Sequence, residues 1–421
     1  MRATLAVDAR VAWSRRPAAA APLGPGVLVS FAQLDDSSPG TVAGSSPIVD
    51  YDWPIAATAQ KLSVHTTLPV PGTCTIGLVV NGIMSALEVT LLIGATDATV
   101  TADVALVAGD VVRWESTGIA GIDNQDFHIS LVYDPDVQAD GYAFFCGNGS
   151  AIVAGQTDRY FPAGVGGAAS LATDGFGGFP GGFQGGGQIG GLWPFVVTLH
   201  ERELVSEDSP DTAWTIDLRR NNAAIIAASV IPIAAVSPFG YDPVSIATVP
   251  PVVGADFAAE GLTHRIQRAS SSQSSGIGYA YRYTLATLTR TFHGMKWAVM
   301  GSASQGIGHW RIGGGGTGSA TETTSAVQSV WPRSGTIRHG AVYAVCESTA
   351  DDRTYTVDIR VNGATVHTWT FTNDATFQIM ETADIGVALA VEDLVNFRAQ
   401  IDTPDNARRI NLMVVFSFEP D

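Results

Sequence analysis

The sequence predicts an all-β chain of three tandem antiparallel β-sandwich domains, each with a jelly-roll-like number of strands. Short apolar runs that alternate with polar residues, separated by turn residues, indicate many short strands. A Trp-Pro dipeptide followed by an asparagine-centred turn occurs three times. The dipeptides begin at Trp53, Trp193 and Trp331, and the turns begin at Asn81, Asn221 and Asn362. Because the runs before these turns also match, we expect one small domain to be repeated three times.

The composition agrees with this fold class. The 421 residues include 46 glycines, and 46% of the chain is hydrophobic while only 15% is charged. Such a chain has enough apolar surface for buried cores, and its length suits about two to four domains. Helical periodicity of any length is not obvious, and we favour a jelly-roll topology over an immunoglobulin-like one.

The charge balance excludes some partners. The chain has 23 basic and 40 acidic residues and a net charge of −17, which disfavours non-specific nucleic-acid binding. No apolar run reaches the roughly 18–20 residues that cross a membrane, and the N-terminal segment lacks the core of a secretory signal. We therefore expect no nucleic-acid or membrane partner.

The three cysteines, Cys74, Cys146 and Cys346, occupy different positions in the repeats. They are too few and too scattered for a disulfide framework. We interpret them as buried free thiols, which predicts assembly in a reducing cytoplasm.

The predicted organisation has four parts. They are an N-terminal arm 1–25, a first copy 26–140, a second copy 141–290 and a third copy 291–421. The arm is basic and Ala/Pro-rich, and either docks on a partner or lies disordered, with docking favoured. Its candidate contacts are Arg10, Arg15 and Arg16.

Within a copy, an apolar run such as 26–33 opens the domain and a run such as 127–133 closes it. Asn81-Gly82 supplies the two positive-φ residues of a type I′ hairpin turn. In the run 355–361, alternation places Tyr355, Val357, Ile359 and Val361 on one inward face. In copy two, residues 249–260 occupy the slot of the penultimate strand, although their prolines weaken that prediction.

Copy two also carries a Gly/Phe-rich insertion, residues 175–191. It contains a G-x-G-x-x-G pattern, which has meaning only between a strand and a helix. We interpret the insertion as a surface loop instead. Phe176, Phe179 and Phe183 either form a partner-contact patch or pack on their own domain.

Catalytic and metal-binding patterns are mostly missing. The eight histidines are dispersed without zinc-like spacing, and pairs of acidic residues such as Asp35-Asp36 fall in predicted loops. We therefore predict no catalytic, cofactor or metal site and no enzyme. The repeated tryptophans could stack on a glycan, but we favour a structural role in which they anchor a strand over each core.

Several turns resemble those of β-sandwich virion proteins of tailed bacteriophages. The residues that carry the likeness are Arg360-Val361-Asn362-Gly363, the turn 107–112 and the segment 156–162, and the likeness runs from about residue 26 to the end. The resemblance implies a head decoration, cement or spike protein, or a fibre. It transfers no catalytic residue.

These observations favour a non-enzymatic virion protein assembled in the host cytoplasm. Its expected partners are other virion subunits, either the major capsid protein or a tail or fibre base. A homo-oligomer is expected, with a trimer favoured. A fibre that binds a host-surface glycan or protein receptor is the first alternative, and a secreted carbohydrate-binding or adhesin module is the second.

Overall fold

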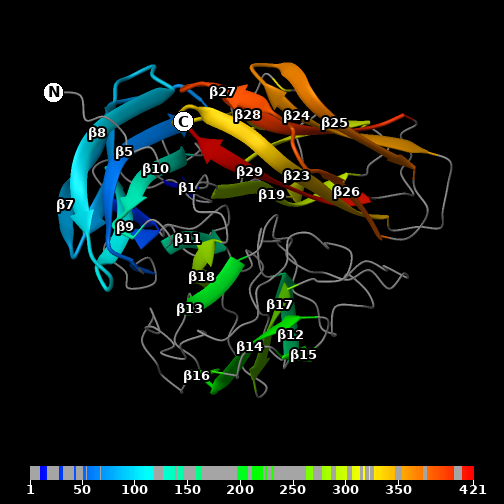
Figure 1. Cartoon of the computed structure of the whole chain (residues 1–421). Coiled ribbons are helices and arrows are strands. Elements are labelled where there is room, and N and C mark those ends of the chain that lie inside the picture. The colour runs from blue at the N-terminus through cyan, green and yellow to red at the C-terminus, as the bar shows by residue number, and fades with distance from the viewer. Residues whose placement is uncertain are drawn as a thin grey trace.

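The computed structural model is built almost entirely from β-strands (Figure 1). The structure describes residues 10–16, 28–31, 42–43, 51–53, 55–66, 68–117, 127–137, 140–145, 158–162, 197–206, 211–220, 223–224, 229–231, 262–268, 277–285, 291–300, 306–312, 316–317, 322, 327–346, 353–372, 377–402 and 410–421. Within these ranges no residue is α-helical, and no helix there could cross a membrane. The all-β prediction is confirmed.

The strands follow one another along the three copies. Copy one contains β1 (Arg10–Arg16), β2 (Leu28–Phe31), β3 (Val42–Ala43), β4 (Tyr51–Asp52), β5 (Ala57–Thr66), β6 (Cys74–Val80), β7 (Ile83–Leu91), β8 (Asp97–Leu106), β9 (Val111–Thr117) and β10 (Phe127–Pro135). Copy two contains β11 (Asp140–Phe145), β12 (Asp158–Pro162), β13 (Val197–Ser206), β14 (Trp214–Arg220), β15 (Ala223–Ala224), β16 (Ser229–Ile231), β17 (Leu262–Arg268) and β18 (Ile277–Leu285). Copy three contains β19 (Thr291–Met300), β20 (Ile307–Arg311), β21 (Gly316–Thr317), β22 (Ser329–Val330), β23 (Gly335–Cys346), β24 (Thr354–Val361), β25 (Ala364–Thr372), β26 (Phe377–Thr382), β27 (Val387–Leu389), β28 (Leu394–Ile401) and β29 (Ile410–Pro420).

Each copy contributes two sheets. We call the sheet that contains the last strand of a copy its closing sheet. We call the other sheet, which contains the strand before the asparagine turn, its turn sheet. In copy one these have the orders β1-β10-β5-β8 and β3-β2-β9-β6-β7, with β4 also on β9. In copy two they are β11-β18-β13 and β12-β17-β14-β15, with β16 on β14. In copy three they are β21-β19-β29-β23-β26, with β27 on β23, and β20-β28-β24-β25, with β22 on β28.

The three copies share one pattern of strand pairing. The first strand of each copy pairs with its last strand, as β1 with β10, β11 with β18 and β19 with β29. The second strand along each copy pairs with the penultimate strand of that copy, as β2 with β9, β12 with β17 and β20 with β28. The repetition seen in the landmarks therefore extends to the topology of all three pairs of sheets.

The structure corrects the start of copy one. Residues 10–16, assigned above to a separate arm 1–25, form β1 and pair with β10 from Arg10↔Tyr133 to Arg16↔Phe127. β1 therefore corresponds to β11 and β19, whereas the predicted opening run 26–33 contains the second strand, β2. The arm assignment is wrong for residues 10–16, because these residues supply the edge strand that β10 requires.

The penultimate strand of copy two also lies elsewhere than predicted. β17 begins at Leu262, beyond the slot 249–260, and pairs with β14 at Arg220↔Leu262. This matches the pairing of Val80 with Val112 in copy one. By that register, Glu260 occupies the sequence position that Asp110 takes in copy one.

Copies one and three each enclose a hydrophobic core between their two sheets. In β24 the predicted inward residues Tyr355, Val357, Ile359 and Val361 are all buried. In β6, Cys74 takes the position of Tyr355 and is a buried free thiol. Most side chains that would form a core in copy two lie outside the described residues, so a third sandwich with its own core stays a prediction.

A hydrogen-bonded corner joins two turns of copy one, at Asn81 and at Asp110, with the segment at Trp53. Asn81 and Gly82 both have positive φ angles, of 50° and 79°, as the predicted type I′ turn requires. The Asn81 side chain donates from Nδ2 to Asp110 Oδ1 at 2.7 Å and accepts from the Val111 N–H at 2.9 Å. The N–H of the buried Trp53 donates to the Asp110 carbonyl at 2.6 Å.

Copy three has the same corner, with nearly the same distances. Asn362 Nδ2 donates to Asp393 Oδ1 at 2.7 Å, and Asn362 Oδ1 accepts from the Leu394 N–H at 2.9 Å. The Trp331 N–H donates to the Asp393 carbonyl at 2.7 Å. The Trp-Pro and asparagine landmarks are therefore parts of one framework element in copies one and three. Asn221 and Trp193 of copy two lie outside the described residues.

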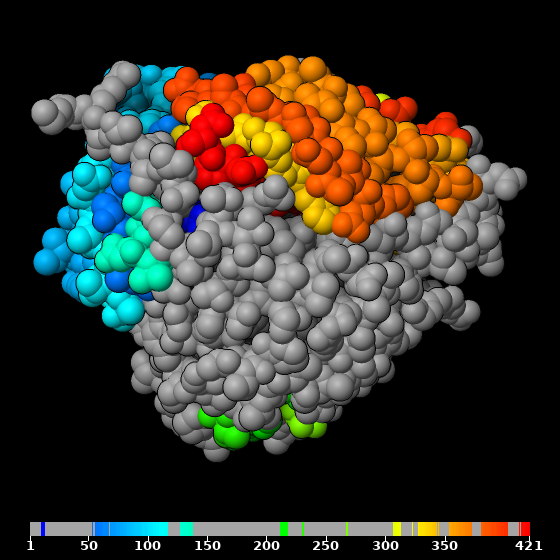
Figure 2. Space-filling model, in the orientation of Figure 1, coloured from blue at the N-terminus to red at the C-terminus, as the bar shows by residue number. Residues whose placement is uncertain are grey.

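Figure 1 shows the three copies placed around β1, β11 and β19, which are the first strands of copies one, two and three. Copy one is blue to cyan, copy two is mostly green, and copy three is yellow to red. β1 and β11 lie side by side between the copies. In Figure 2, copy three adjoins copy one directly at the top of the molecule.

We expect Asp393→Ala to lower the free energy of unfolding by about 0.5–1.5 kcal/mol, because the exposed hydrogen bonds from Asn362 Nδ2 and the Ala390 N–H lose their acceptor. Urea unfolding followed by circular dichroism measures this loss. The control is Asp384→Ala, which removes only an exposed ion pair to Arg338 and should cost less stability. Equal losses in the two variants would contradict a structural role for the corner.

Candidate functional site

The two central strands of the closing sheet of copy one, β5 and β10, are buried on both faces. Their core face carries side chains such as Leu62 and Leu131. Their opposite face carries polar side chains that are also buried: Lys61, Ser63, His65, His128 and Ser130. A buried polar face needs partners. Copy three provides them.

Contacts of Lys61 and His128 attach copy three to this face. Lys61 Nζ donates to the Pro332 carbonyl at 2.7 Å, next to the corner tryptophan of copy three. Arg311 Nη1 lies 2.8 Å from His128 Nε2. Lys61 and His128 lie on neighbouring strands of copy one, whereas Arg311 and Pro332 are far away in sequence. The two sandwiches are therefore docked directly on each other.

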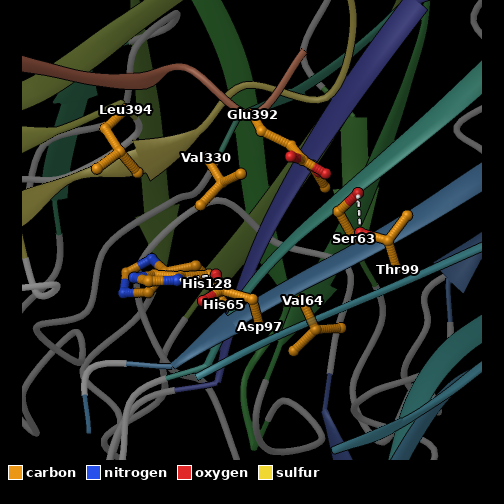
Figure 3. Close-up of a pocket in the computed structure, with 10 residues that line it drawn as sticks. Ser63, Val64, His65, Asp97, Thr99, His128, Val330, Glu392 and Leu394 are labelled. Atoms are coloured by element: carbon orange, nitrogen blue, oxygen red, sulfur yellow. Dashed lines mark hydrogen bonds and ion pairs between the residues drawn. The ribbon is translucent and has the colours of Figure 1, made fainter. Parts of the chain in front are cut away.

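A cavity of about 370 Å³ lies at this interface (Figure 3). Copy one lines it with residues from β5, β8 and β10, and copy three lines it with residues from β22, β28 and the turn before β28. The lining includes Ser63, His65, Asp97, Thr99, His128, Ser130, Val330, Glu392 and Leu394. In Figure 3 the rings of His65 and His128 lie together, and a dashed line joins Ser63 to Thr99.

The two histidines are a cross-strand pair, because His65 of β5 is in register with His128 of β10. Their ring centroids are 6.2 Å apart. His65 Nδ1 lies 2.5 Å from Asp97 Oδ1, which orients that ring. Burial raises the pKa of Asp97, but hydrogen bonds from His65 and Thr96 outweigh burial and hold this pKa below its ordinary value.

Lys61 is a buried amine between the two copies. Burial lowers its pKa, and the nearby Glu392 carboxylate opposes that effect. The bond to the Pro332 carbonyl satisfies one of its three donors. Its role at this position is to join the two copies by a polar contact.

The geometry of the cavity supports binding and docking more directly than catalysis. Ser63 Oγ accepts a hydrogen bond from Thr99 at 3.2 Å, so it contacts a hydroxyl and not the imidazole base that a nucleophilic serine needs. Within the part of the chain that the structure describes, no group of three or more His, Cys, Asp or Glu side chains could hold a metal ion. The side chains instead join two sandwiches.

A second polar cluster covers the outer face of the turn sheet of copy three. Arg398 Nε donates to the buried Asp358 at 2.6 Å, and Arg360 binds Glu322 through two hydrogen bonds of 2.7 Å. The bonds from Arg360 lower the pKa of Glu322, whereas burial lowers the pKa of the neighbouring His309. This is a paired ionic network, which holds the strands and the 322 segment together.

The structure places only part of the predicted partner-contact set. Arg10 is 1% exposed within the folded chain, so its side chain presents almost no surface to a partner, and its contact with a partner stays a prediction. Arg15 and Arg16 are strand residues of β1, whose side chains are not described. Phe176, Phe179 and Phe183 lie outside the described residues, as do the loop pair Asp35-Asp36.

The sequence indicated the structural role of the tryptophans, but it did not identify the residues of the interface. Trp53 and Trp331 are fully buried and pack edge-on against Tyr133 and Phe418, which leaves no ring face for a glycan. By contrast, nothing in the sequence singled out Lys61 or Arg311. The only available signal was polar residues on the outer positions of strands that were expected to be solvated.

The comparisons with known proteins do not assign the chain to a family. No protein-family model and no curated protein matches it. Similar solved structures include the major capsid protein P2 of bacteriophage PM2 (9% identity, 67% of this chain, 98% of that chain, TM-score 0.18) and the Sulfolobus turreted icosahedral virus (7%, 88%, 82%, 0.17). Another is the Cry4Aa toxin of Bacillus thuringiensis (8%, 66%, 52%, 0.19). TM-scores this low carry no argument about fold or function.

The lowered pKa of Asp97 predicts an acid-linked loss of stability. A carboxylate with a lowered folded-state pKa stabilises the fold above its ordinary pKa, and this contribution is lost as pH falls through the folded-state pKa. We expect the native chain to lose stability below about pH 4, and Asp97→Asn to lose less over the same range. Thermal unfolding between roughly pH 2 and 5 measures this. Asp103→Asn, on an exposed position of β8, is the control, and identical pH profiles for native chain and Asp97→Asn would refute the assignment.

Proposed function

We propose that this protein is a non-enzymatic structural component of a tailed-bacteriophage virion, and in particular a capsid-surface decoration, cement or head spike protein. The observation that carries the proposal is the docking of copy three on the closing sheet of copy one through Lys61 and His128. These buried polar contacts join copies one and three into one body. A protein that reinforces a shell or projects from it requires domains that are firmly joined.

The repeated corners also support a structural role. Asn81 with Asp110 and Asn362 with Asp393 are built alike. They serve each sandwich as framework and not as ligand sites. Repeating one rigid sandwich along a chain is an economical way to build a broad or long protrusion.

The charge of the chain agrees with a place near packaged nucleic acid. A net charge of −17 opposes adhesion to nucleic acid while keeping the surface soluble. In this proposal the partners are other virion subunits, such as the major capsid protein, and the finished location is the virion.

Exposed apolar side chains at the ends of copy one favour a second function, contact with a host-surface receptor by a tail or head fibre. Ile83 beside the hairpin turn is 72% exposed, and Ile93 and Leu92 at another turn are 72% and 64% exposed. Groups of exposed apolar residues mark interaction sites. The same residues would serve equally in contact with another virion subunit.

The copy number in purified particles separates the two functions. Quantitative mass spectrometry should find hundreds of copies per particle if the protein decorates the shell. A handful of copies would favour a fibre or a vertex spike. Absence from purified particles would overturn the virion proposal itself.

The mass in solution tests how the chain assembles. We expect a homo-oligomer, with a trimer favoured, so light scattering should give about three times the 43.9 kDa of one chain. The mass of a single chain would contradict the trimer.

A further inference from the structure

The contact between Arg311 and His128 fixes the protonation of one imidazole. The two side chains are buried, and Arg311 Nη1 lies 2.8 Å from His128 Nε2. A guanidinium keeps its charge at any pH that a protein tolerates and has only donors. His128 Nε2 is therefore the acceptor, which requires that it carry no proton.

We propose that this contact is an acid-sensitive clamp, in which protonation of His128 releases copy three from copy one. Histidine is the side chain that ordinarily changes its charge between pH 5 and 8. A protonated His128 has no acceptor for Arg311 and adds a second positive charge at hydrogen-bond distance. One protonation event thus removes an attraction and creates a repulsion.

The surrounding charges strengthen this response. The charged and titratable residues near His128 include Lys61 and His65 of β5, Asp97 of β8, Arg311 of β20 and Glu392 in the turn before β28, and Arg15 of β1 is in register with His128. Asp97 is bonded to His65, and Glu392 acts on Lys61, so each of these carboxylates already has another basic partner.

The cavity gives water and protons a place to enter. His128 lines it, together with Leu394 and Val330 of copy three. Separation of the copies would widen this existing space without breaking either hydrophobic core. The bond from Lys61 to the Pro332 carbonyl does not depend on the charge of His128, so it remains as the second attachment.

Thiol labelling measures the opening of the clamp. The Leu394→Cys variant places a thiol on the cavity wall, and Ile83→Cys places one on an exposed hairpin as a reference. Both are labelled at about pH 7.5 and about pH 5 with an aromatic disulfide that reacts with thiols at both values, and the chain without either substitution gives the background. The ratio of the two rates reports the open fraction independently of thiol chemistry. We expect the ratio to rise about tenfold on acidification, equivalent to about 1.4 kcal/mol.

Two further variants decide whether His128 is the sensor. His128→Gln keeps an acceptor for Arg311 but does not titrate, and Arg311→Gln removes the like charge while keeping a donor and an acceptor. When either substitution is combined with Leu394→Cys, the ratio of labelling rates should change by no more than about twofold across the same pH range. If His128→Gln does not fold, Arg311→Gln decides alone. A ratio that does not change with pH in Leu394→Cys, or that rises as much in these variants, would overturn the clamp.

Discussion

Copies one and three each depend on a corner in which one asparagine and one aspartate hold two turns together. Asn81 and Asp110 are 29 residues apart in sequence, and Asn362 and Asp393 are 31 apart. Their side-chain bonds fix the strand before the turn against the penultimate strand. Because a slip of one residue would turn every side chain of a strand to the other face, this register decides which residues enter the core. The buried tryptophan beside each corner is held by the same turn.

The second constraint is that the central strands β5 and β10 of the closing sheet of copy one are covered on both sides. Their core face is satisfied by apolar packing, whereas their polar face is satisfied by copy three through Lys61 and His128. The two interfaces differ in chemistry, so they can respond differently to conditions. An apolar core does not respond to a proton, but a contact that needs a neutral imidazole does. The architecture thus places a titratable joint between rigid units.

Sequence reasoning reached the fold class, the asparagine turns and the alternation of β24, because each depends on local patterns of neighbouring residues. It missed β1, because an edge strand next to an Ala/Pro-rich segment looks like an arm until its partner β10 is known. It also missed the interface. The pairing of His65 with Asp97 and of His128 with Arg311 depends on contacts between strands and between copies that no sequence spacing reveals. The Gly/Phe insertion 175–191 lies outside the described residues, so its role stays a prediction.

We propose that this chain, with copies one and three docked on each other, is a building block of a virus particle. A cryo-electron microscopy map of purified particles tests this proposal most directly. We expect density for the chain on the particle, with copies one and three in contact through the closing sheet of copy one. A map that shows copies one and three apart would contradict the docking. A particle map that leaves no density for the chain would contradict the structural role.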